Sequence, residues 1–221
     1  MFDLEKYIHD LLLSLRKQYG VRLLYVGLQG SYLRNEATKN SDIDIMVIID
    51  EIGVTDLDSY REILIALGYY EKSCGFICGK SEINNWNPLE ICHLLHTTKD
   101  LHGQLLEFLP NYTIEDERNF IKLSLGNMLH ELSHRYIHSS REKNIAALPK
   151  TYKCVFFIMQ NIYFMDNGIF IVTKRDLLKK LNGIEKEIME MLNTIETCKE
   201  YDFDNAYNLL FSWCQNLIKR I

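Results

Sequence analysis

Two aspartates separated by one residue are the side chains of this chain best suited to holding a metal ion. Asp42 and Asp44 open an apolar segment, residues 45–49, that has the length and composition of a buried strand. Alternate residues of a strand project from the same face about 6.8 Å apart, so both carboxylates are expected to point the same way. Carboxylate oxygens are ligands that Mg²⁺ prefers. The spacing therefore predicts a divalent-cation site where this strand begins.

A glycine–serine turn precedes the two aspartates. Gly30 and Ser31 follow a short apolar segment, residues 23–28, which is a second strand candidate. Glycine has no Cβ and so lets a phosphate approach the backbone, while the serine can donate its hydroxyl or cap a short helix. Beside two metal ions about 3.5–4 Å apart, such a turn can hold a polyphosphate. Residues 27–50 thus have the parts needed to transfer a nucleoside monophosphate from a triphosphate.

Other metal and phosphate motifs do not fit this spacing. A calcium loop needs a glycine at its sixth place and oxygen ligands at alternating places. Counted from Asp42, the fifth and sixth places hold Met46 and Val47. A P-loop needs Gly-Lys-Ser/Thr after four intervening residues, and neither Gly27 nor Gly30 is followed by one. A turn that merely ends in Ser-Asp stays open as an alternative, because Asp-x-Asp alone is a weak pattern.

Length and composition indicate an ordinary globular protein. The 221 residues are 47% hydrophobic and 25% charged, and the net charge of -5 disfavours a broad surface for long nucleic acid. No apolar run approaches the roughly 20 residues that cross a bilayer, and residues 1–6 lack a signal-peptide pattern. We therefore expect a cytoplasmic protein that does not enter a membrane. Its six cysteines are expected to be reduced and to serve as small buried side chains.

Apolar periodicity divides the chain into an α/β part and a helical part. Helices are predicted at residues 3–18 and 56–67, and strands at residues 23–28, 45–49, 75–79 and 89–97. Beyond Pro110, capping-box patterns at residues 113–116 and 173–176 introduce a series of helices, predicted over residues 113–138, 150–166, 173–182, 185–197 and 203–221. The expected fold is α/β (α+β): a small mixed β-sheet in a domain of residues 1–110, then an all-helical bundle domain of residues 111–221.

Residues 30–44, which read Gly-Ser followed by Asp-x-Asp, resemble the signature of the polymerase-β-like nucleotidyltransferase superfamily. The two-part layout is similar to that of bacterial two-domain nucleotidyltransferases of the aminoglycoside and lincosamide type. That family usually has a small residue before its motif arginine and a glycine after it. Here Leu33 and Asn35 flank Arg34, so the arginine is kept and its neighbours are bulkier.

The resemblance implies a third carboxylate, contributed by a neighbouring strand. Glu90 is the first choice, because it stands near the start of the strand predicted at residues 89–97. Asp100, Glu82 and Glu71 are the alternatives, and Glu90 could also be an ordinary solvated acid. A site that lacks a third ligand would indicate an inactive, nucleotide-binding member of the family.

The same resemblance divides the binding of the nucleotide between the two domains. Two Mg²⁺ ions, held by Asp42, Asp44 and Glu90, would bind the NTP that serves as co-substrate. The glycine–serine turn and Arg34 would hold its phosphates. Lys153, near the start of the aromatic-rich helix predicted at residues 150–166, would support the triphosphate, although a single lysine is more often simply solvated.

A zinc-protease motif in the helical part offers a rival hypothesis. His130-Glu131-x-x-His134 matches the metalloprotease pattern, with Glu131 as general base. That chemistry needs a third zinc ligand and a substrate-binding strand, and it leaves the glycine–serine turn and the aspartates unexplained. Glu131 could instead act on the acceptor side of a transferase, as a base or as an anchor for an ammonium group.

The predicted function is Mg²⁺-dependent transfer of a nucleoside monophosphate from an NTP to a hydroxyl of a small molecule. By resemblance, that acceptor is an aminoglycoside-type antibiotic, and the activity would confer antibiotic resistance. A protein or RNA acceptor, as in toxin–antitoxin systems, and a catalytically silent binding module are the alternatives. The sequence does not set the acceptor, the preferred NTP, the general base or the oligomeric state.

Overall fold

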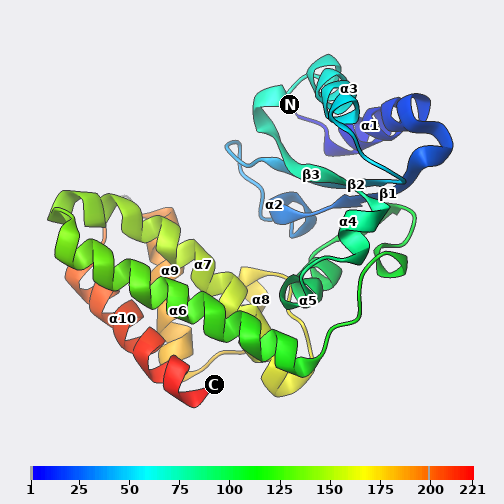
Figure 1. The fold of residues 1–221 in the computed structure, drawn as a ribbon. Helices are drawn as coiled ribbons and strands as arrows, with labels where there is room; N and C mark the ends of the chain where they lie inside the picture. The colour runs from blue at the N-terminus through cyan, green and yellow to red at the C-terminus, as the bar shows by residue number, and fades with distance from the viewer. Residues whose placement is uncertain (1, 199) are drawn as a thin grey trace. The chain divides into compact units, whose positions relative to one another are not determined.

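The computed structural model describes residues 2–198 and 200–221, which fold into two compact units (Figure 1). The first unit, Met1–Asn111, contains a four-stranded sheet with helices on both faces. The second unit, Tyr112–Ile221, is built from helices in the part of the chain that is described. The predicted α+β class, a mixed sheet followed by helices, is confirmed.

The sheet of the first unit has the strand order β3-β2-β1-β4. Strand β1 (Leu23–Leu28) pairs antiparallel with β2 (Ile43–Ile49) and with β4 (Lys99–His102), and β2 pairs parallel with β3 (Ser73–Gly79). Strands β1 and β2 are apolar on both faces because both faces are covered. Helices α1 (Leu4–Tyr19) and α3 (Val54–Leu67) pack on one face, and the segments around α4 (Lys80–Asn84) cover the other (Figure 1).

One predicted strand of this unit is a helix. Residues 89–97 were expected to form the fourth strand, but residues 89–96 lie in α5 (Pro88–His96), and the fourth strand is β4. Pro88 occupies the first turn of α5, and the Asn87 side chain accepts a hydrogen bond from the Leu89 N–H at 3.2 Å. A short apolar run fits a strand or a helix equally well, so this Asn-Pro start decides in favour of the helix.

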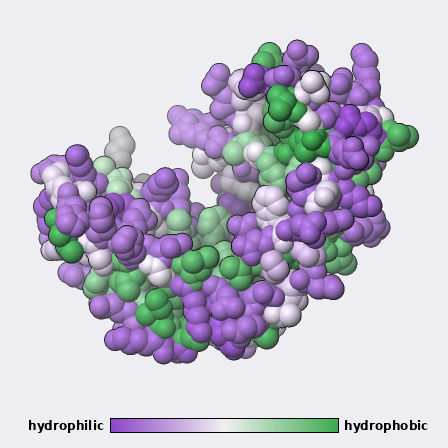
Figure 2. Space-filling view, viewed as in Figure 1, coloured by the Kyte–Doolittle hydropathy of each residue, from purple (hydrophilic) through white to green (hydrophobic). Residues whose placement is uncertain are grey.

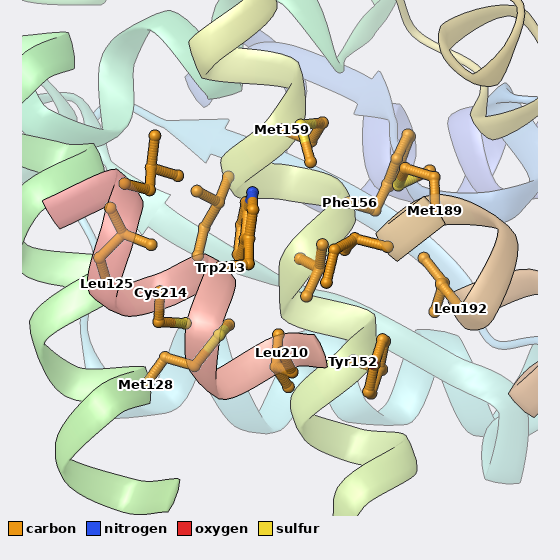
Figure 3. Packing of buried hydrophobic residues seen from close by; sticks show 14 of the residues in the cluster. Leu125, Met128, Tyr152, Phe156, Met159, Met189, Leu192, Leu210, Trp213 and Cys214 are labelled. Atoms are coloured by element: carbon orange, nitrogen blue, oxygen red, sulfur yellow. The ribbon is translucent and has the colours of Figure 1, made fainter. Parts of the chain in front are cut away.

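The second unit is a bundle whose long helices surround one hydrophobic core. Its helices are α6 (Ile114–His138), α7 (Arg141–Asn167), α8 (Lys174–Leu178), α9 (Gly183–Thr197) and α10 (Phe203–Arg220). Figure 3 shows how Tyr152 and Phe156 of α7 and Trp213 of α10 fill this core. Helix α7 begins at Arg141, earlier than the predicted residue 150, because the Ser140 side chain caps it and it continues through Pro149.

Short helical segments complete the chain: α2 (Gly30–Leu33) and the 3₁₀ turns Gly20–Arg22, Tyr70–Lys72 and Leu105–Glu107. Hydrophilic side chains make up most of the surface of each unit in the view of Figure 2, so the apolar strands and helix faces lie inside. None of the helices in residues 2–198 and 200–221 combines the length and the apolar character that a membrane span requires.

Candidate active site

The two aspartates lie together at the beginning of β2. Asp44 is the second residue of the strand, and Asp42 lies just before it. Burial raises the pKa of the Asp44 carboxyl, and the charge of Asp42 raises it further. A hydrogen bond from the Cys74 thiol and the charge of Arg34 act in the opposite direction. Two like charges are thus held close to each other on a partly buried strand end, where a cation would relieve their repulsion.

The glycine–serine turn is built directly against the second aspartate. Gly30 begins the one-turn helix α2, and its φ of +69° lies in the left-handed region that favours glycine. A Cβ on Gly30 would lie 1.8 Å from Oδ2 of Asp44. The Gln29 N–H donates to the Asp44 carbonyl at 2.9 Å, which ties the turn to β2. The structure therefore brings Gly30 and Asp44 together, as the predicted site requires.

Arg34 lies at the end of α2, close to the aspartates. Its Nε donates to Oε2 of Glu36 at 2.9 Å, and its side chain is only 12% exposed. The next residue, Asn35, has a φ of +55°, a conformation that asparagine tolerates better than most residues. This explains how the loop accepts a residue other than the usual glycine. The charge of Arg34 acts on Asp44 and also on His93 of α5, so α5 borders the site.

Glu90, the predicted third ligand, has a different setting from the one expected. It lies in the first turn of α5, not on a strand, and its Oε2 accepts a hydrogen bond from the Trp86 indole Nε1 at 2.6 Å. Among the described residues, no three His, Cys, Asp or Glu side chains form a group that could hold a metal ion. The structure therefore does not bring Glu90 to Asp42 and Asp44 as a third ligand.

Cys74 occupies the place beside Asp44 on the neighbouring strand. The register of the parallel pair β2–β3 sets Asp44 opposite Cys74, and the thiol hydrogen-bonds to the carboxylate. A third acid from an adjacent strand was predicted, and in this sheet that strand position carries a thiol. No sequence pattern indicates this pairing, because the register of β3 depends on its packing with β2.

The alternative acids are not part of this group. Asp100 accepts a hydrogen bond from the Tyr25 hydroxyl at 2.7 Å and so serves the fold. Glu82 lies in the first turn of α4, and Glu71 lies in the 3₁₀ turn that precedes β3.

The rings of Phe76 and Trp86 are stacked on each other. Sequence reasoning did not single out this pair, although the Trp-containing loop was noted.

The candidate residues of the helical unit are exposed. Lys153 lies on the surface of α7 and makes no ion pair with any residue that the structure describes. On α6, the ring centroids of His130 and His134 are 6.0 Å apart, and Glu131 forms an ion pair with Arg135 at 3.0 Å. The ring centroid of His138 lies 4.7 Å from that of His134, yet within the described ranges no three such side chains form a group that could hold a metal ion. The zinc hypothesis therefore lacks both a third ligand and an unpaired glutamate.

Part of the first unit matches a known protein family. Residues 9–73 match the family model described as "Nucleotidyltransferase domain", a span that contains β1, the glycine–serine turn and the aspartates of β2. The first unit therefore contains a region that matches a nucleotidyltransferase domain. The nucleotidyltransferase resemblance predicted from residues 30–44 is confirmed for this part of the chain.

Two known proteins are similar to parts or all of this chain. The chain is 42% identical over 58 residues to the protein adenylyltransferase MntA of Thermococcus cleftensis, in an alignment that covers 24% of this chain and 57% of MntA. The match thus spans little more than half of that curated relative. The fold is similar to the crystal structure of spectinomycin adenyltransferase AAD(9) from Enterococcus faecialis with ATP and spectinomycin. The TM-score is 0.60, with 16% identity, over 98% of this chain and 100% of AAD(9).

Proposed function

We propose that this protein transfers AMP from ATP to a hydroxyl group of a small, amino-bearing acceptor. The acceptor oxygen bonds to the α-phosphorus, the bond from that phosphorus to the bridging oxygen breaks, and pyrophosphate leaves with the electron pair. The hydroxyl proton passes to a base. One observation carries the proposal: AAD(9), described with ATP and spectinomycin, shares the fold of this chain over 98% of its length, helical unit included.

Mg²⁺ is the cofactor that the aspartate pair fits. Asp42 and Asp44 supply hard oxygen ligands, and their mutual repulsion at a partly buried strand end favours a divalent cation between them. When bound, Mg²⁺ would stabilise the charge that develops on the phosphate oxygens and on pyrophosphate. The absence of a third carboxylate, which was expected to mark an inactive member, is compatible with activity. Two carboxylates suffice for this ion because it usually keeps several waters and takes further ligands from the substrate phosphates.

Ser31 and Arg34 can supply further contacts to the phosphates of the nucleotide. Ser31 has a hydroxyl without a hydrogen-bond partner among the described residues, and Arg34 can exchange Glu36 for a phosphate. Gly30 keeps the backbone of the turn close to the metal site. Lys153 is proposed as an additional cation for the triphosphate, on the strength of the family resemblance and its exposed position on α7.

Pyrophosphate release tests this function directly. The purified chain is incubated with Mg²⁺, with each of the four NTPs, and with spectinomycin, streptomycin, kanamycin and lincomycin in turn. We expect release that requires one acceptor together with ATP and that stops when EDTA removes the metal. The adenylylated acceptor is identified by its mass. Absence of release with every pair, despite Mg²⁺-dependent binding of ATP, would instead indicate a silent nucleotide-binding module.

A protein acceptor is the second candidate, and one observation favours it. MntA, which shares 42% identity with this chain over 58 residues, is described as a protein adenylyltransferase. Incubation of the chain with α-labelled ATP and with proteins that co-purify with it tests this alternative. Label that is retained on a protein, together with no adenylylated antibiotic, would favour protein modification over the small-molecule function.

A further inference from the structure

We propose that Phe76, Trp86 and Glu90 form an acceptor subsite that binds a saturated ring carrying an ammonium group. This inference rests on the proposed function, because it assigns the acceptor side of the same site. It gives Glu90 a role different from the metal ligand predicted from the sequence.

The subsite lies on the same face of the sheet as the aspartates. In β3, Cys74 is opposite Asp44 and Phe76 is opposite Met46. Alternate residues of a strand share a face, so Phe76 projects beside the thiol that contacts Asp44, about 6.8 Å further along the strand. Phe76 and Trp86 also pack against the buried residues of this face, which include Met46 and Cys78. The rings therefore adjoin the place where the α-phosphate would be held.

Phe76 and Trp86 form a flat aromatic surface. Their ring centroids are 5.7 Å apart and their planes differ by 14°, so the indole is stacked on the phenyl ring. Both side chains are only partly buried, so part of the stacked pair is accessible to a ligand. The negative faces of aromatic rings attract cations, and Trp is the best of the three aromatic residue types in this respect.

Glu90 adds a negative charge at the edge of this surface. The Trp86 Nε1 donates to its Oε2 at 2.6 Å, which fixes the carboxylate beside the indole ring. The Asn87 cap and Pro88 set the start of α5 and so hold Glu90 one turn after the tryptophan. Glu90 is exposed and forms no ion pair within residues 2–198 and 200–221. Its charge is therefore available to a cation from outside.

The combination selects one chemical class of acceptor. An aromatic surface binds the C–H face of a saturated ring, and a fixed carboxylate binds an ammonium group through a charge-assisted hydrogen bond. A neutral sugar would satisfy only the first of these contacts, and a free amine without a ring only the second. An amino-substituted ring satisfies both and can present a hydroxyl toward Asp44. The alternative is that the indole–carboxylate hydrogen bond serves only to start α5.

Fluorescence quenching measures this binding without relying on turnover. The chain contains two tryptophans, and Trp213 is 1% exposed within the helical core, so acrylamide quenches Trp86 selectively. Spectinomycin and kanamycin are added as amino-bearing probes, and sucrose is the neutral polyhydroxyl probe. We expect at least one amino-bearing probe to protect Trp86 from quenching and sucrose to leave quenching unchanged. Unchanged quenching of Trp86 at concentrations that saturate turnover would overturn the subsite.

Three variants separate binding from a structural role. Glu90→Gln keeps the shape and can still accept the indole hydrogen bond, yet it loses the charge. We expect about a tenfold rise in the KM for the acceptor, with the KM for ATP unchanged. Trp86→Phe should raise the same KM, because the carboxylate loses its tether. The control is Glu62→Gln, an exposed acid of α3, which should change neither constant.

The outcomes distinguish this subsite from the proposed function itself. Turnover together with an unprotected Trp86, or a Glu90→Gln variant in which only kcat or the KM for ATP changes, contradicts the subsite and leaves the transferase intact. Absence of turnover with every acceptor contradicts the proposed function. If no amino-bearing probe protects Trp86 in that case, the subsite is contradicted as well.

Discussion

The carboxylate of Asp44 occupies the space into which a Cβ on Gly30 would project. That Cβ would lie 1.8 Å from Oδ2 and 2.7 Å from Cγ of Asp44. The role predicted for Gly30 is to let a phosphate approach the backbone. The structure adds a second reason, because any side chain at this position displaces the carboxylate that is proposed to bind metal. The two residues of the motif therefore depend on each other sterically.

Gly30→Ala is expected to remove activity while the fold survives. The new methyl group meets a side chain and also requires a strained φ, so Asp44 must move. A displacement of about 1 Å in such a site costs about 100-fold in rate. The rate of pyrophosphate release and the melting temperature are measured together. Gly126→Ala is the matched control, since Gly126 lies within α6 with open space around its Cβ position.

The control variant has its own expected result. Alanine in a helix interior is about 0.5–1 kcal/mol more stable than glycine, so Gly126→Ala should melt slightly higher and retain full activity. A Gly30→Ala variant with normal turnover would show that the Asp44 carboxylate is not needed in its observed position.

Asp44→Asn is expected to abolish Mg²⁺-dependent transfer. The substitution keeps the size of the side chain and removes one of the two negative charges proposed to hold the cation. We expect the rate to fall by about 100-fold or more at saturating Mg²⁺, with the sheet intact by circular dichroism. Asp58→Asn is the control, because Asp58 is an exposed acid of α3 whose carboxylate lies 3.9 Å from Arg61. Undiminished turnover in the Asp44 variant would contradict the proposed mechanism.

His93 makes the stability of the first unit depend on pH. Burial lowers its pKa from 6.5 to about 4, and the charges of Arg34 and His96 contribute in the same direction. Between pH 6.5 and pH 4 the unfolded chain binds a proton that the folded chain does not. The free energy of unfolding therefore falls as the pH drops through this window, by at most about 3 kcal/mol, and this group adds no slope above it.

Amide hydrogen exchange of β1 and β2 measures this slope, because these strands report the stability of the first unit. The His93→Gln variant should show a smaller decline between pH 6.5 and pH 4, whatever its stability at pH 7. Equal slopes for the variant and the parent chain would show that His93 is protonated as easily in the folded state as in the unfolded one.

The central strands and the glycine–aspartate pair could be predicted from the sequence, while the surroundings of the pair could not. Residues 23–28 and 45–49 are apolar without interruption, which fits strands covered on both faces. Strand β4 reads Lys-Asp-Leu-His and has no apolar pattern of its own; it forms because β1 offers a free edge. Because this strand is short and polar, no sequence pattern predicts it.

Local signals also competed in the segment that carries Glu90. Its apolar run was interpreted as a strand, although Asn87 and Pro88 are a helix start, and this error moved Glu90 onto the wrong element. The neighbour of Asp44 on β3 is set by the register of a parallel pair. No local pattern fixes that register, so the position of Cys74 opposite Asp44 could not be predicted from the sequence. The stacking of Phe76 on Trp86 likewise depends on where α4 and α5 fold back onto the sheet.

The zinc motif of α6 should prove dispensable. Glu131 forms an ion pair with Arg135 at 3.0 Å, so it is not a free base. In the described ranges, no third ligand completes a metal site with His130 and His134. The motif therefore has neither the base nor the coordination of a zinc hydrolase. We therefore expect His130→Ala and His134→Ala to change the transfer rate by less than about twofold, which is the usual range for exposed substitutions away from a site. Metal analysis of the purified chain should find no zinc that depends on these histidines. One zinc ion per chain that disappears in both variants, together with hydrolysis of a peptide substrate, would restore the rival hypothesis.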